Sequence, residues 1–360
     1  MKLKTILSGS IIAVSLLISE SYAQKSQPID FKPNNLLVVR VGDGSSGLND
    51  KATPVFLDEY TTTGSLVQSI SMPIAGKGAN AAFVLSGNNQ SQGYSSLSAN
   101  GQFVTLMGYD AAPGTDATAL KSANTPKVIA IVSKKGIDTR TAEAIDIIDT
   151  RTAVTTNGKD IWFAGQKEGI RYIYAGSSKS ERISPPSPNA GRILNIYDNQ
   201  LYVSTSNSSG YITKVGNGTP ISSIRVSPIV PYVPDLNFLA HGYVFFDTDS
   251  SVPGVDLLYV NGDQGTGYLR KYINDGSRWT EVGAPATGIV FKNAALTGTI
   301  EDGKVVLYAS NNSKITKITD NATFTDKLDV KTEVLVSVAS NRAFRGLTFT
   351  PDSKPILVKK

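Results

Sequence analysis

Short apolar runs separated by polar turns repeat along almost the whole chain after residue 23. The runs are rich in β-branched and aromatic residues, and Gly, Asn, Asp, Ser and Pro separate them. Helical periodicity is nearly absent from this part of the chain, and such a pattern is typical of strands and turns. We therefore expect an all-β protein.

One template recurs in this pattern: an apolar strand, a tight turn of Asn, Asp or Gly, and a second, more apolar strand. It is found at 95–108, 151–165, 192–205 and 294–310, with an insertion at 241–261, and begins once more at 344–351. Most of these pairs are followed by two further strand-like runs. Four-stranded units that repeat every 40–58 residues or so are the signature of a β-propeller.

The two ends of the chain complement each other. The C-terminal unit has an innermost strand at 344–351, whereas the N-terminal strands at 36–41, 55–60 and 66–72 lack one. A blade built from both termini would close the ring and remove exposed sheet edges. The sequence thus predicts one propeller domain over 36–360 with six blades, or with seven if 356–359 belongs to a separate blade.

This architecture also sorts the loops. In such a ring, connections between second and third strands lie on the same face as connections between blades. The longest connections belong to these two classes: 42–54, 74–93, 109–126 and 223–240. We expect one loop-rich face, where binding usually occurs, and an opposite face that is nearly bare except for the insertion at 247–256.

The first 23 residues predict a signal peptide. Lys2 and Lys4 precede an apolar stretch at 6–18, and the small residues Ser21 and Ala23 favour cleavage before Gln24. An uncleaved anchor, the alternative, needs about 20 apolar residues, more than this stretch has. We expect an exported protein without a membrane span, in the periplasm or outside the cell, with residues 24–35 as a leader before the propeller.

The composition excludes several classes of site. The 360 residues include no Cys and one His, which excludes disulfides, thiolate metal sites, a Cys nucleophile and multi-His metal sites. The net charge of +5 is spread along the chain without a Lys/Arg cluster, so we expect no nucleic-acid partner. The expected protein is a monomer without a cofactor, calcium being the alternative.

Several segments resemble a group of exported bacterial β-propeller proteins of unassigned activity. They are LLVVRVGDG (36–44), TPVFLDEYTTTGSLVQSI (53–70), GYDAAPGT (108–115), RTAVTTNGKDIWFAG (151–165), GIRYIYAG (169–176), NQLYVS (199–204), GVDLLYV (254–260) and AFRGL (343–347). Their order and spacing cover nearly the whole mature chain. The resemblance implies the fold and export, and no catalytic residues. The chain departs from the group's pattern in having no Arg near 95–98, which argues against a complete ring of arginines.

Three arginines are candidate ligand-binding residues. Arg151, Arg192 and Arg345 stand near the starts of predicted inner strands in three blades, and inner strands line the central channel. Their guanidinium groups could converge on an anionic ligand. The alternative is that each pairs with a carboxylate or with backbone carbonyls at the rim. Tyr109 and Asp110, beside a long loop, are further candidates for ligand contact.

His241 opens another inner strand and is the sole imidazole of the chain. It is therefore the candidate catalytic residue, because imidazole exchanges protons near neutral pH. Its alternative role is that of a hydrogen-bonded residue at the rim. Tyr60 and Tyr94 are predicted near the loop-rich face, where tyrosine suits sugar or protein contact.

Asp-rich loops raise the question of calcium. Asp247, Asp249 and Asp256 offer hard oxygen ligands, as do the pairs Asp43 with Asp50 and Asp110 with Asp116. None has the twelve-residue spacing of a helix–loop–helix calcium site, and Asp is ordinary in turns. These residues are the candidate metal ligands.

Two functions of different classes follow. The first is a binding module that recognises a glycan, a small anion or a protein through the loop-rich face. The second is an enzyme, a lyase or hydrolase of saccharides or lactones, with its site at the central channel. Propellers host both classes.

Overall fold

The computed structural model describes residues 27–166, 168–185, 191–205, 212–230, 239–262, 268–282 and 295–354. These residues are mainly strands, with one short helix, α1 (Ala117–Lys121), assigned among them. The predicted signal peptide at 1–23 and the segment 356–359, on which the seven-blade alternative rests, lie outside the described residues. No helix in the described ranges is long and apolar enough to cross a membrane.

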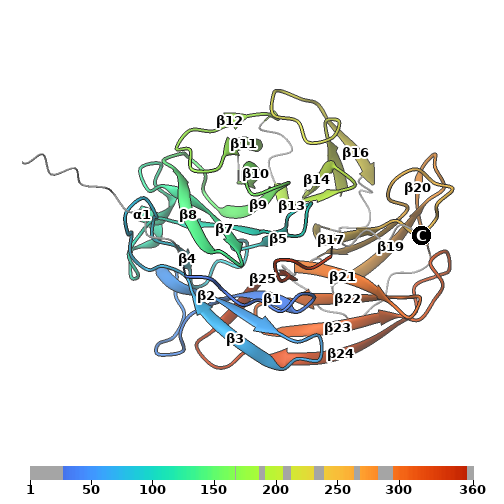
Figure 1. The fold of residues 1–360 in the computed structure, drawn as a ribbon, viewed down its shortest axis with the longest axis horizontal. Coiled ribbons are helices and arrows are strands. Elements are labelled where there is room, and N and C mark those ends of the chain that lie inside the picture. The colour runs from blue at the N-terminus through green and yellow to red at the C-terminus, as the bar shows by residue number, and fades with distance from the viewer. Residues whose placement is uncertain are drawn as a thin grey trace, which may run out of the picture.

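Four sheets each contain four antiparallel strands paired in sequence order (Figure 1). The first two sheets are β9 (Thr150–Thr155), β10 (Asp160–Gly165), β11 (Ile170–Tyr174) and β12 (Glu181–Arg182), then β13 (Gly191–Tyr197), β14 (Gln200–Thr205), β15 (Ile212–Val215) and β16 (Val226–Val230). The next two are β17 (Ala240–Phe246), β18 (Leu257–Gly262), β19 (Tyr268–Asn274) and β20 (Trp279–Glu281), then β21 (Ala295–Glu301), β22 (Lys304–Ser310), β23 (Lys314–Asp320) and β24 (Val330–Ser337).

A nine-stranded sheet contains two further units of the same kind. They are β25 (Ala343–Phe349), β1 (Leu36–Val41), β2 (Ala52–Tyr60) and β3 (Leu66–Ser71), and β5 (Ser95–Leu97), β6 (Val104–Tyr109), β7 (Lys127–Ser133) and β8 (Gly136–Glu143). The short strand β4 (Val84–Ser86) pairs with both β2 and β6 and joins the two units. The sequence pattern placed β4 within a long connection.

The innermost strands contact one another in a closed cycle, in the order β25, β5, β9, β13, β17, β21 and back to β25. The strands of each unit follow outward from this cycle (Figure 1). The predicted pairing of the two chain ends is confirmed, because β25 is antiparallel to β1, with Leu36 opposite Phe349 and Val41 opposite Ala343. The fold is all-β and propeller-like.

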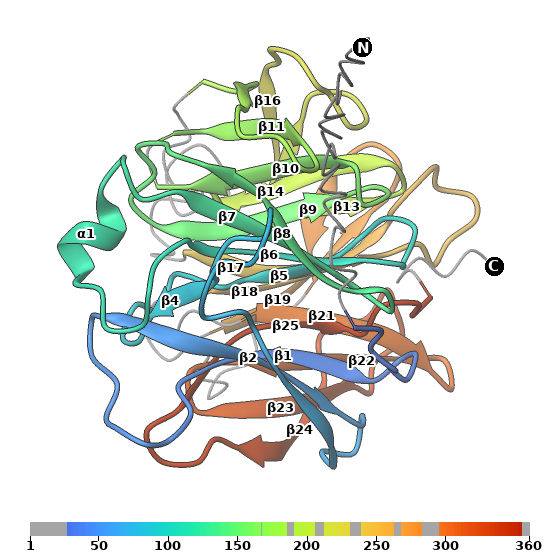
Figure 2. The same ribbon diagram turned by 60° about the vertical axis from the view of Figure 1, so that its left-hand side comes forward.

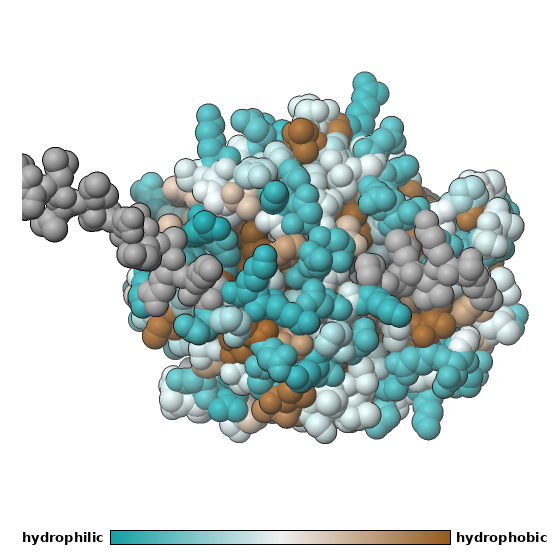
Figure 3. All heavy atoms as spheres, viewed as in Figure 1, coloured by the Kyte–Doolittle hydropathy of each residue, from teal (hydrophilic) through white to brown (hydrophobic). Residues whose placement is uncertain are grey.

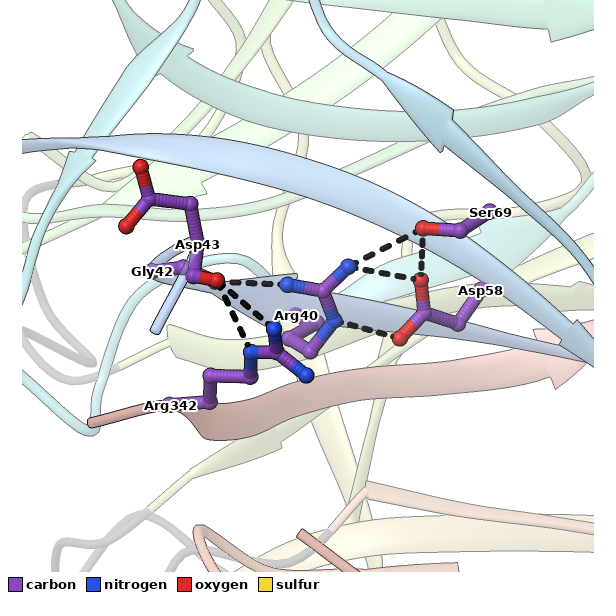
Figure 4. Close-up of polar contacts among 6 residues, drawn as sticks. All are labelled: Arg40, Gly42, Asp43, Asp58, Ser69 and Arg342. Atoms are coloured by element: carbon purple, nitrogen blue, oxygen red, sulfur yellow. Dashed lines mark hydrogen bonds and ion pairs between the residues drawn. The ribbon is translucent and has the colours of Figure 1, made fainter. Parts of the chain in front are cut away.

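Polar contacts surround this joint, and those from Arg342 to Asp43 link the two chain ends (Figure 4). The Arg40 guanidinium donates to both oxygens of Asp58, with Nε 2.5 Å from Oδ2, and its Nη1 donates to the Gly42 carbonyl at 2.6 Å. From the C-terminal segment, Arg342 Nη2 donates to the Asp43 carbonyl at 2.7 Å. Gly42 has φ of 89°, and an added Cβ would lie 2.6 Å from the carbonyl of Asn341, so glycine is required in this close approach.

The apolar core lies between the units. The inner and second strands are mainly buried, and β1 and β17 are buried along their whole length, because each sheet packs against a neighbour on both faces. The outermost strands β3 and β24 are largely exposed. In the view of Figure 3 the surface is mainly hydrophilic, with small, separate apolar patches.

Three of the long connections lie together, as the ring predicts. The Ala52 amide donates to the Thr115 carbonyl at 2.8 Å, and the Gly87 amide donates to the Lys51 carbonyl at 3.1 Å. Figures 1 and 2 show α1, which belongs to the connection 109–126, beside β4. Ahead of β1, the leader segment packs on the fold through the buried side chain of Phe31.

Candidate functional site at the entrance of the ring

Polar and charged side chains gather where the inner strands begin. Arg151, Arg192, His241 and Arg345 lie near the starts of β9, β13, β17 and β25, and Tyr94 directly precedes β5. We call this end of the ring the entrance. The sequence analysis placed the three arginines and the histidine on inner strands, and the structure agrees; their roles remain predictions.

The Tyr94 hydroxyl reaches across the entrance to His241. Its oxygen lies 3.3 Å from Nδ1 of the imidazole. The strands β5 and β17 stand opposite each other in the cycle of inner strands, so this contact spans the ring. Both side chains are buried, at 1% and 0% exposure. The tyrosine–histidine contact therefore forms a bar across the centre of the molecule.

Arg151 is buried beside this bar with part of its hydrogen-bonding capacity unused. Nη1 donates to the Gly191 carbonyl at 3.2 Å, and Nη2 lies 3.8 Å from Oδ2 of Asp149. Its Nε is buried and has no hydrogen-bond partner among the described residues. Burial lowers the pKa of the Arg151 guanidinium, and the neighbouring charge of Arg192 lowers it further, while Asp149 acts in the opposite direction.

Arg192, one residue after the carbonyl that Arg151 contacts, is half-buried. The Nε of Arg192 is also buried and lacks a hydrogen-bond partner within the described ranges. The charge of Arg192 thus acts on that of Arg151, and the Nε of each side chain has no hydrogen-bond partner among the described residues. Such a pair is costly unless an anion or a carboxylate compensates it, and Asp149 meets one of the two arginines at 3.8 Å.

The guanidinium group of Arg345 donates its hydrogen bonds to backbone carbonyls of the protein. Nη2 donates to the Gly87 carbonyl at 2.6 Å, Nε to the Asn89 carbonyl at 3.2 Å and Nη1 to the Phe344 carbonyl at 2.8 Å. Burial lowers its pKa to about 10. These contacts favour the structural alternative for this arginine, because they fix the connection 87–92 at the entrance.

A second set of contacts ties the same connection to Arg151. The side chain of Asn89 donates from Nδ2 to Oδ1 of Asp149 at 2.7 Å. The other oxygen of that carboxylate, Oδ2, lies toward Arg151. The segment 87–92 thus borders the entrance, and Asp149 couples it to the arginine pair. The sequence analysis missed Asp149, although its place two residues before Arg151 is visible in the sequence.

The two remaining candidates for ligand contact, Tyr109 and Asp110, form hydrogen bonds with other residues of the protein. Tyr109 is fully buried; it accepts from Gln92 Nε2 at 2.9 Å and donates to the Ile148 carbonyl at 3.1 Å, and burial raises the pKa of its hydroxyl. Oδ1 of Asp110 accepts from the Ala82 amide at 3.0 Å. Tyr109 also lines a cavity of about 230 Å³ with Asn89.

The predicted calcium ligands act as turn residues. Oδ2 of Asp256 accepts the amides of Thr248 and Asp249 at 2.8 and 2.5 Å, and Oδ1 of Asp249 accepts from Ser251. Of the other candidate pairs, Asp116 forms an ion pair with Lys51. Within the described ranges, no three His, Asp or Glu side chains are grouped so that they could hold a metal ion.

No family model matches the chain, and no curated protein matches it either. Solved structures resemble its fold. A provisionally named 6-phosphogluconolactonase from Bacteroides fragilis is 13% identical, with a TM-score of 0.45 over 88% of this chain and 98% of its own. Another from Bacteroides uniformis is 11% identical, with a TM-score of 0.44 over 88% and 100%. AofleA from Arthrobotrys oligospora is 12% identical, with a TM-score of 0.46 over 86% and 91%.

Proposed function

We propose that this chain is an exported six-bladed propeller that binds a small anion at the entrance of its ring. The observation that carries the proposal is the half-buried Arg192 side chain, which forms no hydrogen bond or ion pair with any described residue and whose charge acts on the buried guanidinium group of Arg151. The six blades correspond to the six four-stranded units on the cycle of inner strands.

A compact anion fits this pair by charge. A carboxylate or phosphate offers several oxygens to a planar guanidinium group, and charge-assisted hydrogen bonds of this kind are strong when they are buried. Asp149, the carboxylate nearest Arg151, is also engaged by Asn89, so it leaves the positive charge of the pair only partly balanced. A bound anion would supply the negative charge that balances the arginine pair.

Calorimetric titration of the full chain with phosphate, sulfate, acetate and galacturonate tests the proposal. We expect saturable binding of at least one of these anions, weakened by added salt, and a loss of about tenfold or more in affinity in Arg151→Gln and in Arg192→Gln. The matched control is Arg140→Gln, which removes an exposed arginine paired with Asp138. Absence of binding, or equal affinity in all variants, would overturn the proposal.

Lactone hydrolysis is the second candidate, favoured by the contact between His241 and Tyr94 at the same entrance. A hydroxyl that holds an imidazole in one orientation suits a general base. Hydrolysis of glucono-1,5-lactone above the uncatalysed rate, abolished in His241→Gln, would support it. A rate equal to that of buffer alone would remove this candidate and leave anion binding unaffected.

A further inference from the structure

The outermost strand of the last unit, β24, has an outer edge that no described segment covers. The strand spans eight residues, Val330–Ser337, and pairs only with β23. Figures 1 and 2 show it at the rim of the molecule, and residues 331–334 are exposed. A turn reaches the strand at Leu335, because an added Cβ on Gly64 would lie 2.7 Å from the Leu335 carbonyl oxygen. The open edge is therefore the segment 330–334.

The outer strands of the other five units offer no comparable edge. The strands β12 and β20 have two and three residues, and β16 contains Pro228, which has no N–H to donate. The edge of β8 is covered, because the Ala81 amide donates to the Thr139 carbonyl and the Thr139 amide donates to Oδ1 of Asn80 at 2.9 Å. The strand β3 has six residues and no charged side chain. Short strands, proline and covering segments are the usual protection of an edge against pairing, and β24 has none of them among the described residues.

The hydrogen bonding between β24 and β23 shows which backbone groups face outward. The Asn321 amide donates to the Asp329 carbonyl at 2.7 Å, so Asp329 turns this carbonyl toward β23. Successive residues of an antiparallel strand turn their backbone groups to alternate sides. The N–H and C=O groups of Val330, Thr332 and Val334 therefore point to the free edge. Three consecutive outward residues can form a ladder with another strand.

A second copy of the same segment fits this edge in one register. When Thr332, the middle of the open edge, lies opposite Thr332 of another copy, all five residues of the segment pair antiparallel. Lys331 of each chain then faces Glu333 of the other, and Val330 faces Val334. A shift of the two-fold axis by one residue in either direction would place Lys331 or Glu333 opposite itself. Opposite charges across a strand pair are favourable and like charges are unfavourable, so charge selects the first register.

The side chains that this register brings together have nothing else to contact. Lys331 and Glu333 are exposed and form no ion pair or hydrogen bond with any described residue. Val334 is 52% exposed. We infer that β24 is the interface of a two-fold symmetric dimer, in which the segments 330–334 of two copies pair and join two four-stranded sheets into one. This dimer differs from the monomer expected from the sequence, and it does not depend on anion binding at the entrance.

Sedimentation velocity of the full chain over a series of concentrations tests the inference. We expect a monomer–dimer equilibrium, and Lys331→Glu and Glu333→Lys each to weaken the dimer about tenfold or more, because each places like charges opposite one another at two symmetric positions. The double variant with both reversals restores the opposite charges and should restore the dimer. The matched control is Lys159→Glu, which reverses an exposed lysine in the turn between β9 and β10 and should leave the dimer unchanged.

Melting temperatures of the same variants separate loss of pairing from loss of folding. Both reversed side chains are exposed, so we expect the single variants to melt at the temperature of the monomeric parent chain. A parent chain that sediments as a monomer at every concentration would show the inference to be wrong. It is equally wrong if a dimer forms and the single reversals do not weaken it, or if the double variant stays as weak as the single ones.

Discussion

The Tyr94 hydroxyl and the His241 imidazole join two inner strands from opposite sides of the ring, with 3.3 Å between their polar atoms. The two residues are 147 positions apart in the chain. Neighbouring units are held by contacts between adjacent inner strands, but this contact links two units that are not neighbours in the cycle of inner strands.

Tyr94→Phe removes this link while it keeps the aromatic ring in place. We expect the free energy of unfolding to fall by about 1 kcal/mol, because a buried hydrogen bond contributes roughly that amount. Urea unfolding followed by tryptophan fluorescence measures the change. Tyr174→Phe, which alters a tyrosine that is 50% exposed, is the control and leaves stability nearly unchanged. Equal stability of both variants would show that the contact does not stabilise the ring.

The buried ion pair of Arg40 and Asp58, which joins β1 to β2, predicts a larger effect. Asp58→Ala leaves the buried Arg40 guanidinium without its carboxylate, and removing one partner of a buried pair costs about 3–5 kcal/mol. We expect a lower urea midpoint with an unchanged dependence of the unfolding free energy on urea. Asp30→Ala, which removes an exposed partner of Lys32, serves as control with little expected effect. A similarly small loss for Asp58→Ala would contradict the stabilising role of this ion pair.

Gly346 permits the close approach of β25 to the segment before β5. A Cβ at this position would lie 2.4 Å from the Gly93 carbonyl oxygen and 2.5 Å from the Ser95 amide nitrogen, both backbone atoms. Gly346→Ala should therefore destabilise the fold by about 1–3 kcal/mol or more, measured as a lower melting temperature. Gly47→Ala is the control, because the nearest atom to its added Cβ is 4.0 Å away. Equal melting temperatures for the two variants would refute the close packing of these strands.

Lys127 makes stability depend on pH in the alkaline range. Burial lowers the pKa of its ammonium group from the ordinary 10.5 to about 8, although the carbonyls of Ser122 and Thr125 accept hydrogen bonds from it. Asp146, the nearby acid, opposes this shift. Between pH 8 and pH 10.5 the unfolded chain binds more protons than the folded one, so the free energy of unfolding rises with pH across this window. As pH falls through about 8, this contribution to stability is lost.

Lys127→Met tests this dependence. We expect the parent chain to show a rise in melting temperature between pH 8 and pH 10.5, and the variant to lose it. Lys121→Met, a change at an exposed lysine of α1, should keep the rise. The same slope in the parent chain and in Lys127→Met would mean that another group controls stability in this range.

Much of the fold could be predicted because strand and turn patterns are local. The apolar runs mark the paired strands, as in β13 and β14, and the missing inner strand at the N-terminus indicates that β25 completes the first unit. The strand β4 was missed because three residues carry too little alternation to distinguish a strand from a loop. The arginines were placed correctly on inner strands, but their partners could not be predicted.

The sequence by itself determined the all-β architecture, the four-stranded unit and the joining of the chain ends, since each depends on alternation and turn residues within a short stretch. Only the tertiary structure decided that Arg345 is held by backbone carbonyls, whereas Arg151 and Arg192 keep unused donors. It also placed Tyr94 against His241. These relationships depend on how separate units approach one another around the ring, and no local pattern of residues specifies those distances.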